Sequence, residues 1–197
     1  MRTFAIWLAL ALMPLAAMEK QEKLHNDQVA AEEITLAPGE SAPETGHPAV
    51  VVWFSDGSAS GRKVAKGDVV FRSAGSEALR NTGTAALPLV RVEFLGDGAP
   101  ETWGTTGLSP NYKLLLENRY TRTYDIRIPA GTREPQHTHH ARVVVCLSGA
   151  VLKHLMPDGR EEPSTLATGE VAWRGPSTHI GQNLGKTDLW VIAVEPK

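Results

Sequence analysis

The 197-residue sequence is poor in cysteine, because Cys146 is the only one. A single thiol cannot form a disulfide within the chain, so the fold must depend on side-chain packing. Cys146 stands in the apolar run Val143–Leu147. This setting predicts a buried core residue rather than a reactive thiol.

The sequence also lacks an excess of positive charge. It has 20 Lys and Arg against 22 Asp and Glu, a formal net charge of −2 at pH 7, and no lysine-rich block. Nucleic acid is therefore not an expected partner. Four arginines could attract an acidic small molecule, although we expect most of them on solvated strand faces. They are Arg119, Arg122, Arg127 and Arg142.

No apolar run reaches the roughly 20 residues that a membrane-spanning helix needs. The run Phe4–Ala17 has 14 residues and follows the positive Arg2. With a cleavage site at Leu15-Ala16-Ala17, residues 1–17 are typical of a secretory signal peptide. We therefore expect a periplasmic or secreted protein that does not contact the membrane after cleavage, with an uncleaved membrane anchor as the alternative.

Long segments of helical period are absent as well. The only helix candidates are a polar arm at 19–28 and a turn over 110–117. Elsewhere, short β-branched runs alternate with Gly, Pro and Asp turn signals. Examples of these runs are Val50-Val51-Val52, Val69-Val70-Phe71, Val143-Val144-Val145 and Trp190-Val191-Ile192. This rhythm predicts an all-β sandwich or barrel of short antiparallel strands.

The sequence resembles itself at two offsets. An offset of 102 residues places Asp56-Gly57 on Asp158-Gly159 and Asn81 on Asn183, and further upstream the offset falls to 92. The first half therefore lacks about ten residues, roughly one β-hairpin. A repeat this long implies two copies of one barrel-like unit, with chance similarity between Gly-rich β segments as the alternative.

The repeat and the composition divide the chain into five segments. They are a signal peptide (1–17), a mobile arm (18–28), a first unit with a weakened pattern (29–95), a linker (96–110) and a second, site-bearing unit (111–197). The linker is rich in Gly, Thr and Pro, which is typical of a boundary between domains.

Three histidines of the second unit form the most informative pattern. His137-Thr138-His139 lies on a predicted strand, where residues two apart share a face, so both imidazoles can bind one metal ion. His179 follows forty residues after His139, in a turn bracketed by Gly and Pro. Together they predict a metal site inside a β-barrel. Three unrelated histidines are the alternative.

The same residues resemble the cupin superfamily. Gly131-x5-His137-x-His139 resembles the first signature, G-x5-H-x-H-x3/4-E-x6-G, and residues 169–183 resemble the second, G-x5-P-x-G-x2-H-x3-N. The resemblance covers residues 120–195 at full strength and 34–93 in weakened form. It implies a double-stranded β-helix, or jelly-roll barrel, with two cupin-like units in tandem.

The glutamate of the first cupin signature is missing. It falls at Val143, or at Val144 with the longer spacing, and neither side chain can bind a metal. The resemblance therefore carries over three ligands: His137, His139 and His179. In this respect the chain is similar to cupin dioxygenases of the thiol- and diketone-cleaving type, which keep only histidines.

A metal site without a carboxylate ligand has a higher net positive charge than a site with one. Three neutral imidazoles leave a divalent ion with its full +2 charge, which favours an anionic, chelating ligand such as an enolate, thiolate or carboxylate. Open coordination positions are typical of catalytic sites. We expect one divalent ion, and imidazole suits Fe, Zn, Mn, Ni and Cu alike. Fe(II) is favoured because iron could bind substrate and O₂ together, whereas zinc could activate water.

Other polar residues near the motif are weaker candidates. His154, on the following strand, is a candidate acid or base at the cavity. His140 faces away from His139, so we expect it to be exposed. Glu134 could bind the metal from the turn before the histidine pair, but we expect a solvated side chain.

The first unit has lost most of the pattern, because Thr45, His47 and Glu77 occupy the positions of the three histidines. Two possible ligands rarely hold a metal, so we expect this unit to serve in packing, with a residual His47/Glu77 site as the alternative. Four aromatic residues on predicted strands are expected to pack in the core. They are Tyr120, Tyr124, Trp173 and Trp190.

These patterns favour an exported, mononuclear metal-dependent enzyme that oxidises a small, anionic or chelating organic molecule with O₂. Two alternatives stay open, because fold does not fix function. One is a non-catalytic cupin module that binds a small molecule or a metal, and the other is a zinc-type isomerase or hydrolase. Exposed barrel edges could also pair in a homodimer.

Overall fold

A computed structural model describes residues 18–197, and the predicted signal peptide at 1–17 lies outside this range. The described residues form sixteen strands and no helix, hence none that could cross a membrane, and the all-β prediction is confirmed. The first seven strands are β1 (Glu19–His25), β2 (Val29–Leu36), β3 (Ala49–Trp53), β4 (Gly57–Ala59), β5 (Arg62–Val64), β6 (Val69–Arg72) and β7 (Leu87–Phe94). The others are β8 (Tyr112–Glu117), β9 (Thr121–Ile128), β10 (His137–His139), β11 (Arg142–Ser148), β12 (Ala150–Leu155), β13 (Glu161–Leu166), β14 (Val171–Arg174), β15 (Ser177–Asn183) and β16 (Leu189–Pro196).

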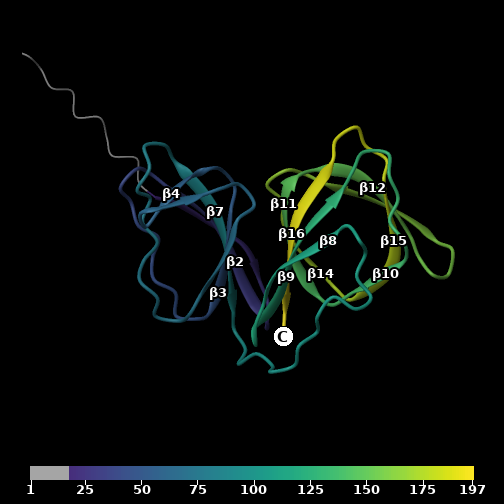
Figure 1. The fold of residues 1–197 in the computed structure, drawn as a ribbon, viewed down its shortest axis with the longest axis horizontal. Coiled ribbons are helices and arrows are strands. Elements are labelled where there is room, and N and C mark those ends of the chain that lie inside the picture. Colours follow the sequence, from purple (N-terminus) through teal and green to yellow (C-terminus); the bar gives the residue numbers. More distant parts are fainter. Residues whose placement is uncertain (1–17) are drawn as a thin grey trace, which may run out of the picture.

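The strands form two barrel-like units that lie side by side (Figure 1). The first unit has a five-stranded sheet in the order β1-β2-β7-β3-β6 and the short hairpin β4–β5. The second has a five-stranded sheet in the order β14-β11-β16-β9-β8 and a four-stranded sheet in the order β10-β15-β12-β13. Apolar residues from both of these sheets meet inside the second barrel.

Strand alternation gives each unit its own core and leaves a third core between the units. On β11, Val144 and Cys146 pack inside the second barrel, whereas Val143 and Val145 pack against the first unit. Each buried side chain of this size contributes about 1.5–3 kcal/mol, so the core between the units is a major source of stability. Its members are Val29, Ala31, Val50, Val52, Val90, Val92, Phe94, Val143, Val145, Leu147, Ile192 and Val194.

The residues that were expected in the core are found there. Cys146 is fully buried, and burial raises the pKa of its thiol to about 11. Tyr124 is also fully buried inside the second barrel. Tyr120, Trp173 and Trp190 are partly buried against the core between the units. All four aromatic side chains therefore contribute to core packing.

Two buried asparagines show that the units are copies of one fold. The side-chain amide nitrogen of each donates hydrogen bonds to two backbone carbonyls of its own unit. The acceptors are Leu36 and Ala85 for Asn81, both at 2.8 Å, and Ile128 and Thr187 for Asn183, both at 2.9 Å. The asparagines therefore tie equivalent strands together in the two units.

The units differ at one hairpin, which is shortened in the first unit rather than missing. Asn81 bridges to Ala59 of β4, and Asn183 pairs with Leu152 of β12, so β4–β5 is equivalent to β12–β13. Only Ser60 and Gly61, with φ of 47° and 78°, turn the first hairpin. Because the second hairpin is extended beyond Leu152, the predicted match of Asp56-Gly57 with Asp158-Gly159 is wrong.

Both helix candidates are strands instead. Residues 19–25 of the predicted mobile arm form the edge strand β1, which pairs with β2 and also contacts β14 of the second unit. Lys23 pairs with Glu33 at 2.9 Å, and Leu24 packs against the core between the units. These contacts override the polar composition of the segment. Residues 112–117 likewise form β8, paired with β9.

The segment 96–110 contains no strand and packs on the second unit. The backbone nitrogen of Trp103 donates to the Glu117 carboxylate at 2.6 Å. The Trp103 ring stacks on His140, with ring centroids 3.9 Å apart. His140 is exposed, as expected from strand alternation, and this stacking gives it a packing partner outside the barrel.

Candidate metal centre

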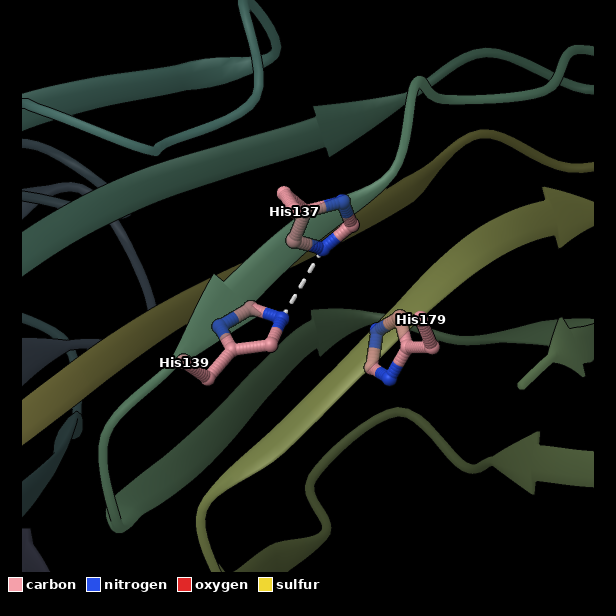
Figure 2. Close-up of side chains that lie close together, drawn as sticks. All are labelled: His137, His139 and His179. Atoms are coloured by element: carbon pink, nitrogen blue, oxygen red, sulfur yellow. Dashed lines mark hydrogen bonds between the residues drawn. The ribbon is translucent and has the colours of Figure 1, made fainter. Parts of the chain in front are cut away.

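The three predicted histidines lie together on two neighbouring strands of the second unit (Figure 2). The short strand β10 places His137 directly opposite His179 of β15. Because residues two apart on a strand share a face, His139 joins them on the same side of the sheet. One ring nitrogen of each residue lies within 4.8 Å of the others, and each residue is at most 6% exposed. The imidazoles therefore surround one point inside the barrel.

Hydrogen bonding orients the first of these imidazoles. His137 Nδ1 lies 2.9 Å from the carbonyl oxygen of Pro135. A carbonyl only accepts, so Nδ1 carries the proton and Nε2 presents its lone pair to the barrel interior. That Nε2 lies 2.9 Å from Nε2 of His139, whose own Nδ1 is buried without a partner among the described residues. Converging imidazole nitrogens of this kind fit a divalent transition metal.

Burial keeps the three imidazoles neutral. Desolvation lowers the pKa of His179 to about 3 and lowers the pKa values of His137 and His139 from their ordinary value. The nearby Arg142 guanidinium lowers the pKa of His139 further. Because a metal ion binds the deprotonated imidazole, all three residues are available as ligands at neutral pH.

Tyr112 of β8 also reaches this point, and the sequence patterns did not reveal it. Its phenol oxygen lies 2.9 Å from His137 Nε2 and 3.1 Å from His139 Nε2. Burial raises the pKa of Tyr112 well above its ordinary value, so the phenol stays protonated and donates. Tyr112 was missed because residues 110–117 were expected to form a helical turn and not a strand. The strand alternation of 112–117 was the only signal that could have placed it inside.

Glu134 is buried beside the histidines, so the expectation of a solvated side chain is wrong. Its carboxylate oxygen Oε2 lies 3.9 Å from His137 Nε2, and Oε1 has no partner among the described residues. The backbone nitrogen of Glu134 donates to the carbonyl of Gly181 at 2.8 Å, which draws the turn before β10 into the barrel. Burial raises the pKa of Glu134 to about 7. A Cβ on Gly181 would lie 2.6 Å from Oε2, so glycine makes room for the carboxylate.

His154 lies on the extension of β12 that the first unit lacks. Its ring stacks on His179, with centroids 4.3 Å apart and an interplanar angle of 15°. Desolvation lowers the pKa of His154, so it is a neutral imidazole at the cavity wall. The longer hairpin of the second unit thus supplies both a wall of the site and a candidate proton acceptor.

A cavity of about 70 Å³ is lined by His139 and His179, and it shares lining residues, among them His154 and His179, with a second space of about 340 Å³. Val144 lines the inner cavity, whereas Val143 packs against the first unit. The glutamate of the cupin signature would therefore stand at Val144. Its replacement by valine leaves an apolar wall where a carboxylate ligand would be. Other apolar walls come from Ile126, Ile128, Leu152, Leu166, Leu189 and Val191.

The first unit has no comparable centre. His47 and Glu77 are exposed, and the buried hydroxyl of Thr45 donates to the carbonyl of His47. Apolar side chains fill the interior of this unit, among them the buried Trp53 and Leu89. The described residues thus give this unit a packed core, as expected for a packing partner.

No protein-family model and no curated protein sequence matches this chain. Solved structures do resemble it. AerE from Microcystis aeruginosa is 13% identical with a TM-score of 0.65, and 95% of each chain is covered. A cupin 2 conserved barrel domain protein from Leptotrichia buccalis is 15% identical with a TM-score of 0.58, covering 92% of this chain and 90% of that one.

Bacillus subtilis oxalate decarboxylase, which has Mn(II) centres, is 11% identical with a TM-score of 0.55, and the match covers 90% of this chain and 75% of the decarboxylase. At these identities the similarity establishes the fold. The chain has the cupin fold, as the sequence motifs indicated, and its three-histidine cluster supports metal binding in the second unit.

Proposed function

We propose that the second unit binds one divalent metal ion through His137, His139 and His179. The observation that carries the proposal is the convergence of three buried, neutral imidazoles on one point. Three protein ligands leave coordination positions open, which is typical of catalytic sites rather than closed structural ones. The adjoining cavity gives a small molecule access to that point.

We infer further that the protein is an enzyme that oxidises a small chelating organic molecule with O₂, with Fe(II) as the native ion. Fe(II), when bound, supplies the redox chemistry. The chain supplies the rest. Apolar walls such as Ile126 and Val191 keep bulk water away. The protonated Tyr112 phenol can donate a hydrogen bond, and the neutral His154 imidazole can accept one.

Imidazole ligands alone do not select iron, so zinc, manganese, nickel and copper are tested beside it. Manganese has a specific reason for inclusion, because Bacillus subtilis oxalate decarboxylase holds Mn(II) on a similar fold. The absence of a carboxylate ligand at Val144 favours ions that tolerate an all-imidazole set and an anionic substrate.

The test is oxygen uptake after anaerobic reconstitution with each ion, using a panel of diketones, thiols and catechols. Uptake by the Fe(II)-loaded chain, and not by a His179→Ala chain treated in the same way, supports the oxygenase. Tight ligand binding without uptake indicates a non-catalytic module instead. Turnover of the zinc-loaded chain without oxygen indicates an isomerase or hydrolase.

We also propose that the protein is exported and loses residues 1–17. The support is the apolar run behind Arg2. The intact mass of the protein recovered from the periplasm or medium of producing cells tests this. A mass that lacks residues 1–17 agrees with export, and a full-length chain confined to the cytoplasm contradicts it.

A further inference from the structure

Arg142 is a buried cation without a counter-ion. It is the first residue of β11 and is 7% exposed. Among the described residues no carboxylate lies within 4.0 Å of its guanidinium. Its two hydrogen bonds both leave from Nη1, to the carbonyls of His140 at 3.2 Å and Gly175 at 3.3 Å. Burying an unpaired charge is expensive, so this arrangement calls for an anion from outside the chain.

The other two buried arginines show the usual solution. Arg122 is 3% exposed, and its Nε and Nη2 donate to Glu195 at 3.0 and 2.8 Å. Arg91 is 4% exposed and pairs with Glu32 and with Glu93. Within residues 18–197, Arg142 alone combines burial with the lack of a carboxylate partner. The expectation that such arginines lie on solvated strand faces is therefore wrong for Arg122 and Arg142.

Arg142 stands at the junction of the two cavities. It lies two residues before Val144, on the same face of β11, and it lines both the inner and the outer space. Arg174 of β14 is its cross-strand neighbour and lines both spaces as well. Like charges placed directly opposite each other destabilise a sheet. Arg174 pairs with Glu170 at 3.2 Å, so Arg142 is the guanidinium that an anion between cavity and solvent would compensate.

We propose that Arg142, assisted by Arg174, binds a carboxylate of the substrate at the mouth of the metal-centre cavity. The inference rests on the proposed metal-dependent function and narrows its substrate class to small organic acids. His139 and His179 line the same inner cavity as Arg142. A molecule with a carboxylate at one end and a metal-binding group at the other can therefore engage both. Planar guanidinium groups bind carboxylates with two parallel hydrogen bonds, which suits this role.

The test compares malonate with malonamide, its neutral analogue, by calorimetric titration of the metal-loaded chain. We expect malonate to bind about tenfold or more tightly than malonamide, the difference that a charge-assisted hydrogen bond supplies. Arg142→Gln should reduce this preference about tenfold, the part that the guanidinium supplies beyond the metal ion, and Arg142→Lys should retain some of that part. Arg62→Gln is the matched control, because Arg62 is an exposed residue of the first unit and carries the same charge change.

Thermal unfolding confirms that each variant is folded. If Arg142→Gln does not fold, the comparison is made with Arg142→Lys instead. Equal malonate affinity in the native chain and Arg142→Gln, with metal still bound in both, overturns the assignment and leaves the metal proposal standing. A native chain that binds metal but no malonate overturns it too. If no metal binds, the proposed metal-dependent function fails by itself. The anion site is then tested in the metal-free chain, where malonate binding that is weakened by Arg142→Gln would still support it.

Discussion

His137 lies directly opposite His179 in the antiparallel ladder between β10 and β15, with ring centroids 4.9 Å apart. Forty-two positions of sequence separate the two residues, yet the ladder register puts both on one face. His139 completes the group by strand alternation alone. The geometry of the centre thus follows from one three-residue strand and its pairing, and changes to neighbouring positions have predictable consequences.

Restoring a carboxylate at Val144 should couple stability to metal. Without metal, Val144→Glu replaces a packed valine by a buried carboxylate, and we expect a loss of up to about 3–5 kcal/mol, reduced by any ion pair with Arg142 in the same cavity. With a divalent ion bound by the three histidines, the new carboxylate gains a ligand role and most of the loss should be recovered. Chemical unfolding with and without metal measures both effects.

Val51→Glu is the matched control, since Val51 is buried in the core of the first unit, where no histidine cluster is found among the described residues. It should be destabilised to a similar extent and should not respond to metal. Equal metal responses of Val144→Glu and Val51→Glu would contradict the position assigned to the missing ligand.

The metal-free protein should lose stability as the pH falls below about 6.5. The unfolded imidazole has a pKa near 6.5, whereas burial lowers the folded pKa of His179 to about 3. Between these values the unfolded chain binds more protons, so stability is complete above about pH 6.5 and is lost toward pH 3. Each such group contributes a slope of about 1.4 kcal/mol per pH unit. His137 and His139 shift in the same direction.

Glu134 opposes this trend. Its folded pKa of about 7 lies above the unfolded value, so its contribution is present at low pH and lost as the pH rises toward 7. Three histidines outweigh one glutamate, and the net slope stays positive between pH 5 and 6.5. Urea unfolding at several pH values measures how the free energy of unfolding changes with pH. His179→Ala, which has one buried imidazole fewer, should show a smaller slope. A free energy of unfolding that does not change with pH would count against three buried neutral imidazoles.

Much of this arrangement follows from sequence, and the exceptions have physical causes. The all-β fold and the shared face of His137 and His139 follow from local periodicity, which acts over a few residues, whereas His179 was added by the resemblance to the second cupin signature. Tyr112 was missed and Glu134 was placed wrongly because the positions of both side chains depend on partners distant in sequence. Tyr112 is positioned by the pairing of β8 with β9, and Glu134 by the hydrogen bond from its backbone nitrogen to the carbonyl of Gly181. Strand β1 was missed for the same reason, because packing overrides its polar composition.

The two buried arginines of the second unit should respond oppositely to neutralisation. Arg122→Met leaves the Glu195 carboxylate buried without its ion pair, so we expect a loss of about 3–5 kcal/mol. Arg142→Met removes a buried charge that has no carboxylate partner, so the metal-free chain should be unchanged or more stable. Urea unfolding of both variants decides the matter. A large loss in Arg142→Met would reveal a structural role for that guanidinium.

Removing the phenol hydroxyl at the centre should strengthen metal binding. The Tyr112 phenol oxygen lies 2.9 Å from Nε2 of His137 and 3.1 Å from Nε2 of His139, the atoms that would bind the ion. Because the phenol competes with the ion for a lone pair, Tyr112→Phe should raise the metal affinity by up to about tenfold, the equivalent of one hydrogen bond. Competition with a chromophoric chelator measures the affinity. Tyr120→Phe, which alters a tyrosine packed between the units, is the control and should bind as the native chain does. Unchanged affinity and turnover in Tyr112→Phe would exclude a role for its hydroxyl.

The most direct test is the metal content of the purified protein and three alanine variants, determined by elemental mass spectrometry beside circular dichroism. We predict one divalent ion per chain in the native protein and in His47→Ala, whose side chain is exposed in the first unit. His137→Ala and His179→Ala should lose the ion while keeping the β-sheet spectrum, because the buried cores lie outside the histidine cluster. Metal content that is the same in all four proteins would contradict the proposed centre.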